Sequence, residues 1–331
     1  MKNIRVYGLT CVLVMLASVT VRATTIVLPT DEQLIAKSPV IVEGTVVSTT
    51  PVERNGAIWT ETTVEVSRNI KGRTERTITV RELGGVLDGR ATKIFGGAEF
   101  RSGERVLLFL DATAHGFRTV DLFVGKLTEA KMANGRRLWL RTDHEQDATL
   151  LDADFRPLAS QNVQRDAERF ETFVAERVAG RAGTKNYGVE NPILARQQST
   201  GVHGGVTSDF TLIDDPTIYR WFRFESGQAA AWVSSGTQPG YSNGGVSELQ
   251  TAMASWNNYT AAKILYTYAG VRNGSLGGLE TPNGANEVLF NDPLNEITGT
   301  WEKSKGGVVG TGGFNAVSSR LAWNAPFEAD L

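Results

Sequence analysis

Side chains that could carry chemistry are few in this 331-residue chain, and they are far apart in the sequence. The three histidines are His115, His144 and His203, and no two of them are close enough to share a helical turn. Zinc needs three or four converging ligands, so the charged segment around His144 does not by itself predict a metal site. The single cysteine, Cys11, lies in a segment that we expect to be removed, which excludes disulfides and thiolate-bound zinc from the mature chain. We therefore assign no catalytic, cofactor-binding or metal-ligating residue.

Two polar segments have both a ligand interpretation and a turn interpretation. The glycine-rich run 306–313 is followed by Phe314-Asn315, whereas a Walker loop ends in Gly-Lys-Ser/Thr and a dinucleotide fingerprint needs a βαβ unit around it. Flexible backbone or a tight crossing between strands is the favoured interpretation. Asn291-Asp292 before Pro293 is typical of an Asx turn, and a structural calcium ion held by these oxygens is the alternative.

The N-terminal residues 1–23 have the pattern of a secretory signal peptide. Lys2 and Arg5 give a positive start, 6–19 is a nearly continuous apolar run, and Val21-Arg22-Ala23 places short residues at the expected cleavage site. A membrane anchor is the alternative, but the run is shorter than the ~20 residues that span a bilayer. We expect a secreted protein, extracellular or periplasmic, with no membrane span in the mature chain.

The length and charge of the mature chain bound its organisation. Its 308 residues (331 minus 23) are enough for two domains. A net charge of −2, with acids and bases interspersed, gives no reason to expect nucleic acid or an anionic membrane surface as a partner. We predict an α+β protein, monomeric, with a small β-barrel at 24–150, a helix and linker at 151–208, and an incomplete α/β domain at 209–331.

The barrel prediction comes from short strand patterns separated by glycines. Thr30 and Gln33 have the spacing of a capping box and open a short helix that Pro39 ends. Apolar and polar residues alternate over 58–66, and 106–110 is apolar throughout, which indicates a strand buried on both faces. Further strands are expected at 76–83, 117–126 and 136–141. Over roughly 30–142 this order of strands and glycines resembles a barrel module of the OB or netrin-like type.

The next segment predicts one helix and a linker. Phe170, Phe173, Val174 and Val178 recur at helical spacing within 166–178, so this helix should pack on the barrel or link the two domains. Residues 180–205 lose that period and gain Gly, Asn, Gln, Ser and Thr, a composition typical of an exposed linker.

The C-terminal part alternates strands with one helix. Strands are expected at 218–224, 264–269, 287–290, 321–324 and 327–331. The helix between the first two is indicated by apolar residues on one face, with Asn243 as its candidate N-cap. Those apolar residues are Val246, Leu249, Met253 and Trp256.

The ordered segments of 219–331 resemble a known family. In chain order they are Arg220-Trp221-Phe222, Ala252-x-x-x-Trp256, Ile264-Leu265-Tyr266, Asn286-Glu287-Val288-Leu289-Phe290-Asn291-Asp292-Pro293, Gly306-Gly307-Val308-Val309-Gly310 and Glu328-Ala329-Asp330-Leu331. This set is similar to the N-terminal part of a matrixin-like metzincin, a secreted zinc metallopeptidase. The resemblance implies a twisted sheet over a helix, and an edge strand beginning near Phe327 that binds extended peptide by backbone pairing. It also implies a later helix carrying HExxH, whose glutamate acts as general base on zinc-bound water.

The sequence contains no HExxH. We expect the parent protein to be a secreted zinc metalloendopeptidase with peptide or protein substrates, and this polypeptide to be a truncated form that binds no zinc and is inactive. We also expect 209–331 to be poorly stable alone. The alternative is a non-catalytic secreted binding or adhesion protein that recognises carbohydrate or peptide. A third hypothesis is that the barrel acts on the protease in cis, as a chaperone or inhibitor. The residues proposed for the carbohydrate or peptide surface are Trp221, Trp232, Trp256, Trp301 and Trp323.

Overall fold

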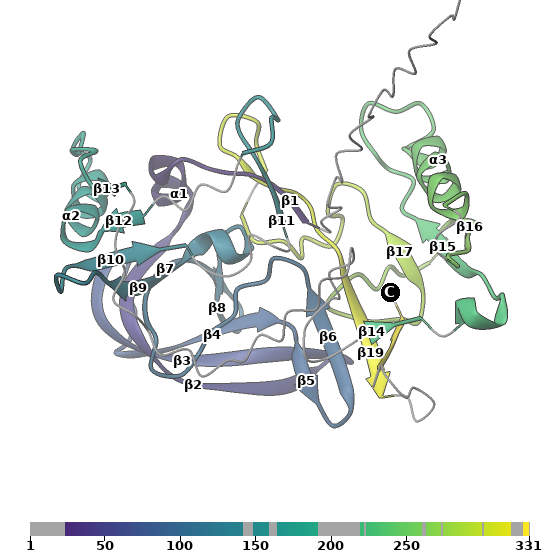
Figure 1. Ribbon diagram of the computed structural model, residues 1–331, viewed down its shortest axis with the longest axis horizontal. Coiled ribbons are helices and arrows are strands. Elements are labelled where there is room, and N and C mark those ends of the chain that lie inside the picture. The colour runs from purple at the N-terminus through teal and green to yellow at the C-terminus, as the bar shows by residue number, and fades with distance from the viewer. Residues whose placement is uncertain are drawn as a thin grey trace, which may run out of the picture.

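β-Strands dominate the part of the chain that the computed structural model describes (Figure 1). The described residues are 24–141, 148–158, 164–190, 219–221, 223–259, 263–272, 274–299, 301–318 and 327–330. Their α-helices are α1 (Asp31–Lys37), α2 (Ala167–Val178) and α3 (Val246–Asn257). The structure is therefore α+β and rich in strands. The predicted signal peptide 1–23 lies outside the described residues, as do the strand predicted at 321–324 and most of the predicted linker.

The largest sheet has nine strands in the order β13-β12-β10-β9-β7-β2-β3-β4-β8. Their bounds are β2 (Val40–Arg54), β3 (Ala57–Lys71), β4 (Thr77–Leu83), β7 (Arg105–Thr113), β8 (Gly116–Thr119), β9 (Lys126–Lys131), β10 (Arg137–Leu140), β12 (Gln164–Asp166) and β13 (Gly188–Val189). β2 and β3 form a long antiparallel hairpin around Asn55 and Gly56, which have φ values of 52° and 89°. An Asn-Gly pair adopts two successive positive φ angles at little cost, and the twist of such a turn matches that of the paired strands.

Strand β8 pairs in parallel with β4 and antiparallel with β7. Consecutive pairings therefore lead from β2 through β3, β4, β8 and β7 back to β2. All of 106–110 in β7 is fully buried, which confirms the predicted strand with two buried faces. The buried apolar cluster shared by these strands and the adjoining loop consists of Val40, Val42, Val46, Val64, Ile78, Val80, Ala98, Phe100, Val106, Leu108 and Leu110.

The first two helices are placed by local signals that the sequence carries. Thr30 and Gln33 form the predicted reciprocal capping box at the start of α1, and the helix ends at Lys37. The predicted helix at 166–178 is also confirmed as α2, which begins after its N-cap Asp166. Its buried face joins the main core cluster, which includes Trp139, Phe170, Phe173, Val174 and Tyr187.

The single strand predicted at 117–126 is wrong. β8 ends at Thr119, a 3-10 turn η1 (Leu122–Gly125) follows, and β9 starts at Lys126. Asp121 has a left-handed φ of 54° that interrupts the extended backbone. The Asp121 carboxylate is fully buried and accepts a hydrogen bond of 2.7 Å from Lys37 Nζ in α1. A long-range contact therefore fixes this break, which local apolar pattern could not reveal.

Three smaller sheets complete the fold, with the strand orders β11-β1-β18, β14-β20-β19-β6-β5 and β16-β15-β17. The strands of the first two are β1 (Thr24–Val27), β5 (Gly85–Leu87), β6 (Arg90–Ile94), β11 (Ala148–Leu151), β14 (Tyr219–Arg220), β18 (Gly307–Gly310), β19 (Gly313–Ser318) and β20 (Phe327–Asp330). The third sheet contains β15 (Ala230–Ser234), β16 (Tyr266–Val271) and β17 (Asn286–Val288). Strands from both sides of the predicted domain boundary share two of these sheets, since β18 pairs with β1 and β19 pairs with β6. The boundary itself stays a prediction.

Two local predictions in the C-terminal part are wrong. Asn243 is not the N-cap of α3, because the cap position is Gly245, and Gly244 and Gly245 both have left-handed φ values that separate Asn243 from the helix. The strand predicted at 218–224 is reduced to β14, and a 3-10 turn η2 (Arg223–Ser226) follows it. Its aromatic residues gave a strand pattern, but Trp221 and Phe224 instead pack edge to face, with their ring centroids 5.0 Å apart.

Candidate functional site

The three histidines do not form a site in the described structure. His115 is exposed in the turn between β7 and β8, as predicted, while His144, His203 and Cys11 lie outside the described residues. No group of three or more His, Cys, Asp or Glu side chains that could hold a metal ion occurs within the described ranges. A catalytic zinc therefore does not fit the residues that the structure places.

The predicted helix, α3, lies in a parallel three-stranded unit whose central strand β15 was not predicted, because the strand expected before the helix was 218–224. β15 lies in the middle, and both β16 and β17 pair with it in parallel. α3 connects β15 to β16, and Figure 1 shows it packed beside these two strands. Asn257 at the end of α3 fixes the start of β16, since its side-chain amide donates to Tyr266 O at 2.8 Å and accepts from Tyr266 N at 2.7 Å.

Three carboxylates in β17 and the loop after it, those of Glu287, Asp292 and Glu296, bind backbone N–H groups. Glu287 accepts hydrogen bonds from the backbone N–H groups of Gly277 and Gly278 at 2.9 and 3.0 Å. Asp292 accepts from the backbone N–H groups of Glu296 and Ile297 at 2.9 and 3.1 Å. The chain does turn here, with Asn295 N donating to Asp292 O at 3.1 Å, but the side-chain bonds reach residues four and five positions on, not the second residue on as in the predicted Asx turn. Each of the two carboxylate oxygens is engaged by a donor. These bonds give no support to the calcium alternative, which needs these oxygens for the cation.

Burial and hydrogen bonding shift the pKa values of two of these acids in opposite directions. Burial raises the pKa of Glu296, and the backbone N–H groups of Leu279 and Glu280 offset only part of that effect. For Glu287 burial also acts to raise the pKa, but hydrogen bonds led by the Gly278 N–H outweigh it and hold the pKa below its usual value. Shifted pKa values are common at functional sites but also arise in structural networks, and the causes here are burial, contacts within 277–296 and the charge of Arg272 after β16.

The strand expected to bind substrate is not an edge strand. Within its sheet β20 lies between β14, with which it pairs in parallel, and β19, with which it pairs antiparallel. Strand addition requires an unpaired backbone edge, and pairing on both sides of β20 covers Phe327 and Glu328. The prediction that this strand binds extended peptide at a free edge is therefore wrong for the structure described.

The tryptophans proposed for a carbohydrate surface do not gather on one face. Trp221 and Trp232 pack edge to face with their ring centroids 6.2 Å apart, within an aromatic cluster. Trp256 is 42% exposed on α3, whereas Trp301 is 37% exposed and packs edge to face against the ring of Phe155. Trp323 lies outside the described residues. Of the four proposed tryptophans that the structure describes, Trp221 and Trp232 pack against each other, and Trp256 and Trp301 are each partly exposed.

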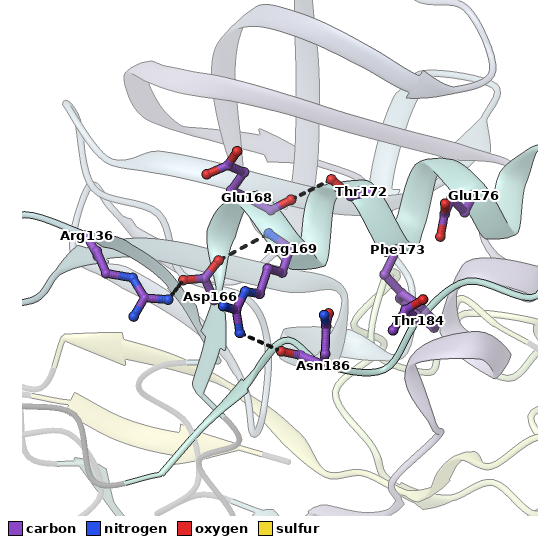
Figure 2. A pocket seen from close by; sticks show the side chains of 9 residues that line it. All are labelled: Arg136, Asp166, Glu168, Arg169, Thr172, Phe173, Glu176, Thr184 and Asn186. Carbon is purple, nitrogen blue, oxygen red and sulfur yellow. Dashed lines mark hydrogen bonds and ion pairs between the residues drawn. The ribbon is translucent and has the colours of Figure 1, made fainter.

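A polar cavity that the sequence did not predict lies along α2 (Figure 2). Its volume is about 520 Å³, and its side chains come from α2, from the end of β12 and from the segments before β10 and β13. Asp166 pairs with Arg136, and Arg169 donates to Asn186 O at 3.1 Å. The lining groups are Arg136, Asp166, Glu168, Arg169, Thr172, Phe173, Glu176, Thr184 and Asn186. They include no histidine or cysteine, and Figure 2 shows Asp166 joined to Arg136 and Arg169 joined to Asn186.

No protein-family model matches this chain, and no curated protein matches it. Within the described residues, no helix combines the length and the apolar character needed to cross a membrane.

Proposed function

We propose that this chain is part of a secreted zinc metalloendopeptidase of the matrixin-like type. The observation that supports the proposal is the parallel unit of β15, α3, β16 and β17, in which a helix connects two neighbouring parallel strands. This is the sheet-over-helix arrangement that the resemblance implies for the opening of such a domain. The substrate class under this proposal is peptide or protein.

This polypeptide, taken by itself, is proposed to be inactive. Its sequence has no HExxH, and the zinc ligands of a complete parent would have to come from residues that it does not contain. The matrixin-like proposal therefore concerns the parent protein, and no catalytic step is assigned to any side chain here.

The N-terminal part is proposed to be a barrel module of the OB or netrin-like type. Its support is the ring of pairings through β2, β3, β4, β8 and β7, together with the buried apolar cluster that these strands share. We propose that residues 1–23 direct secretion and are cleaved near Ala23. Nucleic acid is not proposed as a partner.

The experiment that tests this function compares two secreted proteins. One is the polypeptide of this sequence, and the other is the product of the genomic reading frame if that frame continues through codon 331. Zinc content by mass spectrometry and cleavage of a quenched peptide library are measured for both. The expected result is zinc and peptidase activity in the longer product only. A stop codon directly after codon 331, or stoichiometric zinc in this polypeptide, would overturn the proposal.

A further inference from the structure

Two C-terminal strands of this chain, β18 and β19, pair with the N-terminal strands β1 and β6. β18 pairs antiparallel with β1, and β19 pairs with β6 along five residue pairs from Gly313↔Ile94 to Val317↔Arg90. Figure 1 shows the yellow strand β19 beside the blue strand β6, although more than two hundred residues separate them in sequence. In such pairing the backbone N–H and C=O groups of one part become the hydrogen-bond partners of the other.

The glycines of the run 306–313 allow this close approach. A Cβ at Gly313 would lie 2.5 Å from Ile94 Cδ1 and 2.6 Å from Lys93 O, and one at Gly306 would lie 2.6 Å from Val27 O. Any side chain at these positions would push the C-terminal backbone away from the N-terminal strands. The predicted tight crossing between strands is therefore confirmed, and it specifies contact between the two parts.

The C-terminal part has few buried apolar side chains. Among the residues beyond 218 whose side-chain burial the structure describes, they are Ala230, Met253, Phe314 and Ala316, while the aromatic cluster around Trp221, Trp232 and Tyr266 is only partly buried. Phe314 and Ala316 belong to a cluster with Ala91 of β6, so the C-terminal unit depends on the N-terminal part for half of its buried apolar side chains. Helix α3 buries a single residue, and its other side chains remain at least partly exposed.

The N-terminal part does not show the same dependence. Its main core clusters consist of residues between Ile26 and Tyr187, and C-terminal residues contribute only partly buried side chains at their margin. Strand pairing serves both parts, but the N-terminal part keeps its main core clusters without any buried side chain from the C-terminal part.

Polar contacts also join the two parts at the junction, by which we mean the contacts of β1, β6 and the β8–η1 corner with residues 279–318. Thr92 Oγ1 donates to Asn315 Oδ1 at 2.5 Å. Thr24 Oγ1 lies 2.9 Å from Thr311 Oγ1, and the β8–η1 corner is bound by Thr298 Oγ1, which donates to Thr119 O at 2.6 Å. Within the protein interior such bonds are costly to break without replacement partners.

From these contacts we propose that residues 24–190 act as a permanent folding scaffold for the C-terminal part, and are not a segment to be cut away and released. After a cut in the predicted linker, the two pieces would remain one folded complex, because strand pairing and shared core hold them together. This inference does not require the C-terminal part to be a peptidase.

The test inserts a specific protease site into the predicted linker of the full chain, at residue 200 in one protein and at residue 205 in another. Cleavage is checked on a denaturing gel, and the pieces are then separated by size-exclusion chromatography under native conditions. Two matched variants accompany the uncut wild type: Ala91→Arg places a charge in the buried junction, and Ala269→Arg places the same side chain on the exposed face of β16. Hydrogen exchange of all three uncut proteins, read by mass spectrometry, follows peptides from 307–318.

The expected result is co-elution of the cut wild-type pieces, with exchange in 307–318 about tenfold faster or more in Ala91→Arg and unchanged in Ala269→Arg. Separation of the cut wild-type pieces into two stable, independently folded proteins would overturn the proposal. Unchanged exchange of 307–318 in Ala91→Arg would also overturn it. If Ala91→Arg does not fold, or if neither site is cut, the remaining one of these two measurements decides.

Discussion

Replacing Arg118 should weaken the junction between the two parts more than replacing any exposed arginine. Arg118 lies in β8, is 8% exposed, and donates from one guanidinium nitrogen to Glu280 Oε1 and to Glu296 O, both at 2.8 Å. The guanidinium carbon lies 5.3 Å from the ring centroid of Trp59. The positive charge also acts to lower the pKa of Glu82 in β4. One N-terminal cation thus stabilises both a buried acid and the C-terminal loop.

The expected cost of Arg118→Met follows from these contacts. Methionine keeps most of the apolar stem but removes the charge and both hydrogen bonds. Removing one partner of a buried ion pair typically costs about 3–5 kcal/mol. Glu280 is 32% exposed at its side chain, so solvent screens that part of the interaction. We therefore expect the free energy of unfolding to fall by about 3 kcal/mol, toward the lower end of that range.

The pH dependence of the stability of Arg118→Met tests whether Glu82 is the buried charge that loses its partner. Burial raises the pKa of Glu82 above its usual value of 4.5, and hydrogen bonds from Thr119 N and Oγ1 offset only part of this. An acid whose pKa is raised by folding contributes stability that is present below its unfolded pKa and is lost as the pH rises through its folded pKa. Without Arg118 the folded pKa of Glu82 should rise further. Arg118→Met should therefore be more destabilising at about pH 8 than at about pH 5.

Urea unfolding of the full mature chain at both pH values measures the effect, and Arg76→Met serves as the control because Arg76 is 84% exposed at its side chain. The double variant Arg118→Met/Glu82→Gln should recover about 1 kcal/mol or more relative to Arg118→Met alone, because the buried carboxylate is gone. A loss below about 1 kcal/mol in Arg118→Met, or a loss equal at both pH values, would show that the reasoning about this junction is wrong.

Three further predictions concern single positions. Burial acts to raise the pKa of Asp31, but Arg165 outweighs it and holds the pKa below its usual 3.8. The stability that this pair contributes is present above pH 3.8 and is lost as the pH falls. Asp31→Asn should therefore reduce the fall in melting temperature below about pH 4, measured in thermal melts. Asp292→Ala should lower the free energy of unfolding by about 1 kcal/mol, because two N–H groups lose their acceptor. A chelator should leave the wild-type melting temperature unchanged, and a lower melting temperature would favour the calcium alternative. Gly44→Ala should cost about 1–3 kcal/mol in urea unfolding, since its Cβ would lie 2.7 Å from a carbonyl oxygen of the adjacent strand, whereas Gly188→Ala has open space and should change little.

The elements that the sequence predicted well are those fixed by neighbours in the chain. The capping box of Thr30 and Gln33 needs only three residues of separation, and it marks the start of α1. The helical spacing of Phe170, Phe173 and Val174 predicted α2 and its buried face. The Asn55-Gly56 turn was missed, although the sequence carries the signal for it.

The elements that the sequence predicted poorly are those fixed by distant partners. Asp121 bends the chain because Lys37 binds its carboxylate, and those residues lie 84 positions apart. The pairing of β19 with β6 likewise has no local signature, since strand patterns describe which face is buried and not which strand lies alongside. For the candidate site, absence of HExxH could be read from the sequence, whereas the cavity beside α2 depends on Asp166 and Arg136 meeting across two elements.

Three acids whose pKa values are raised by burial, Glu82, Asp121 and Glu296, lie around the β8–η1 corner. A fourth, Glu171, lies in α2 and is bonded to Trp139. A catalytic acid with a raised pKa has to face substrate, with its proton free to move. Here Glu82 is bonded to Thr119, Asp121 to Lys37, and Glu296 to backbone N–H groups. Each of the three carboxylates is therefore engaged within the fold, and its raised pKa follows from burial that these contacts only partly offset.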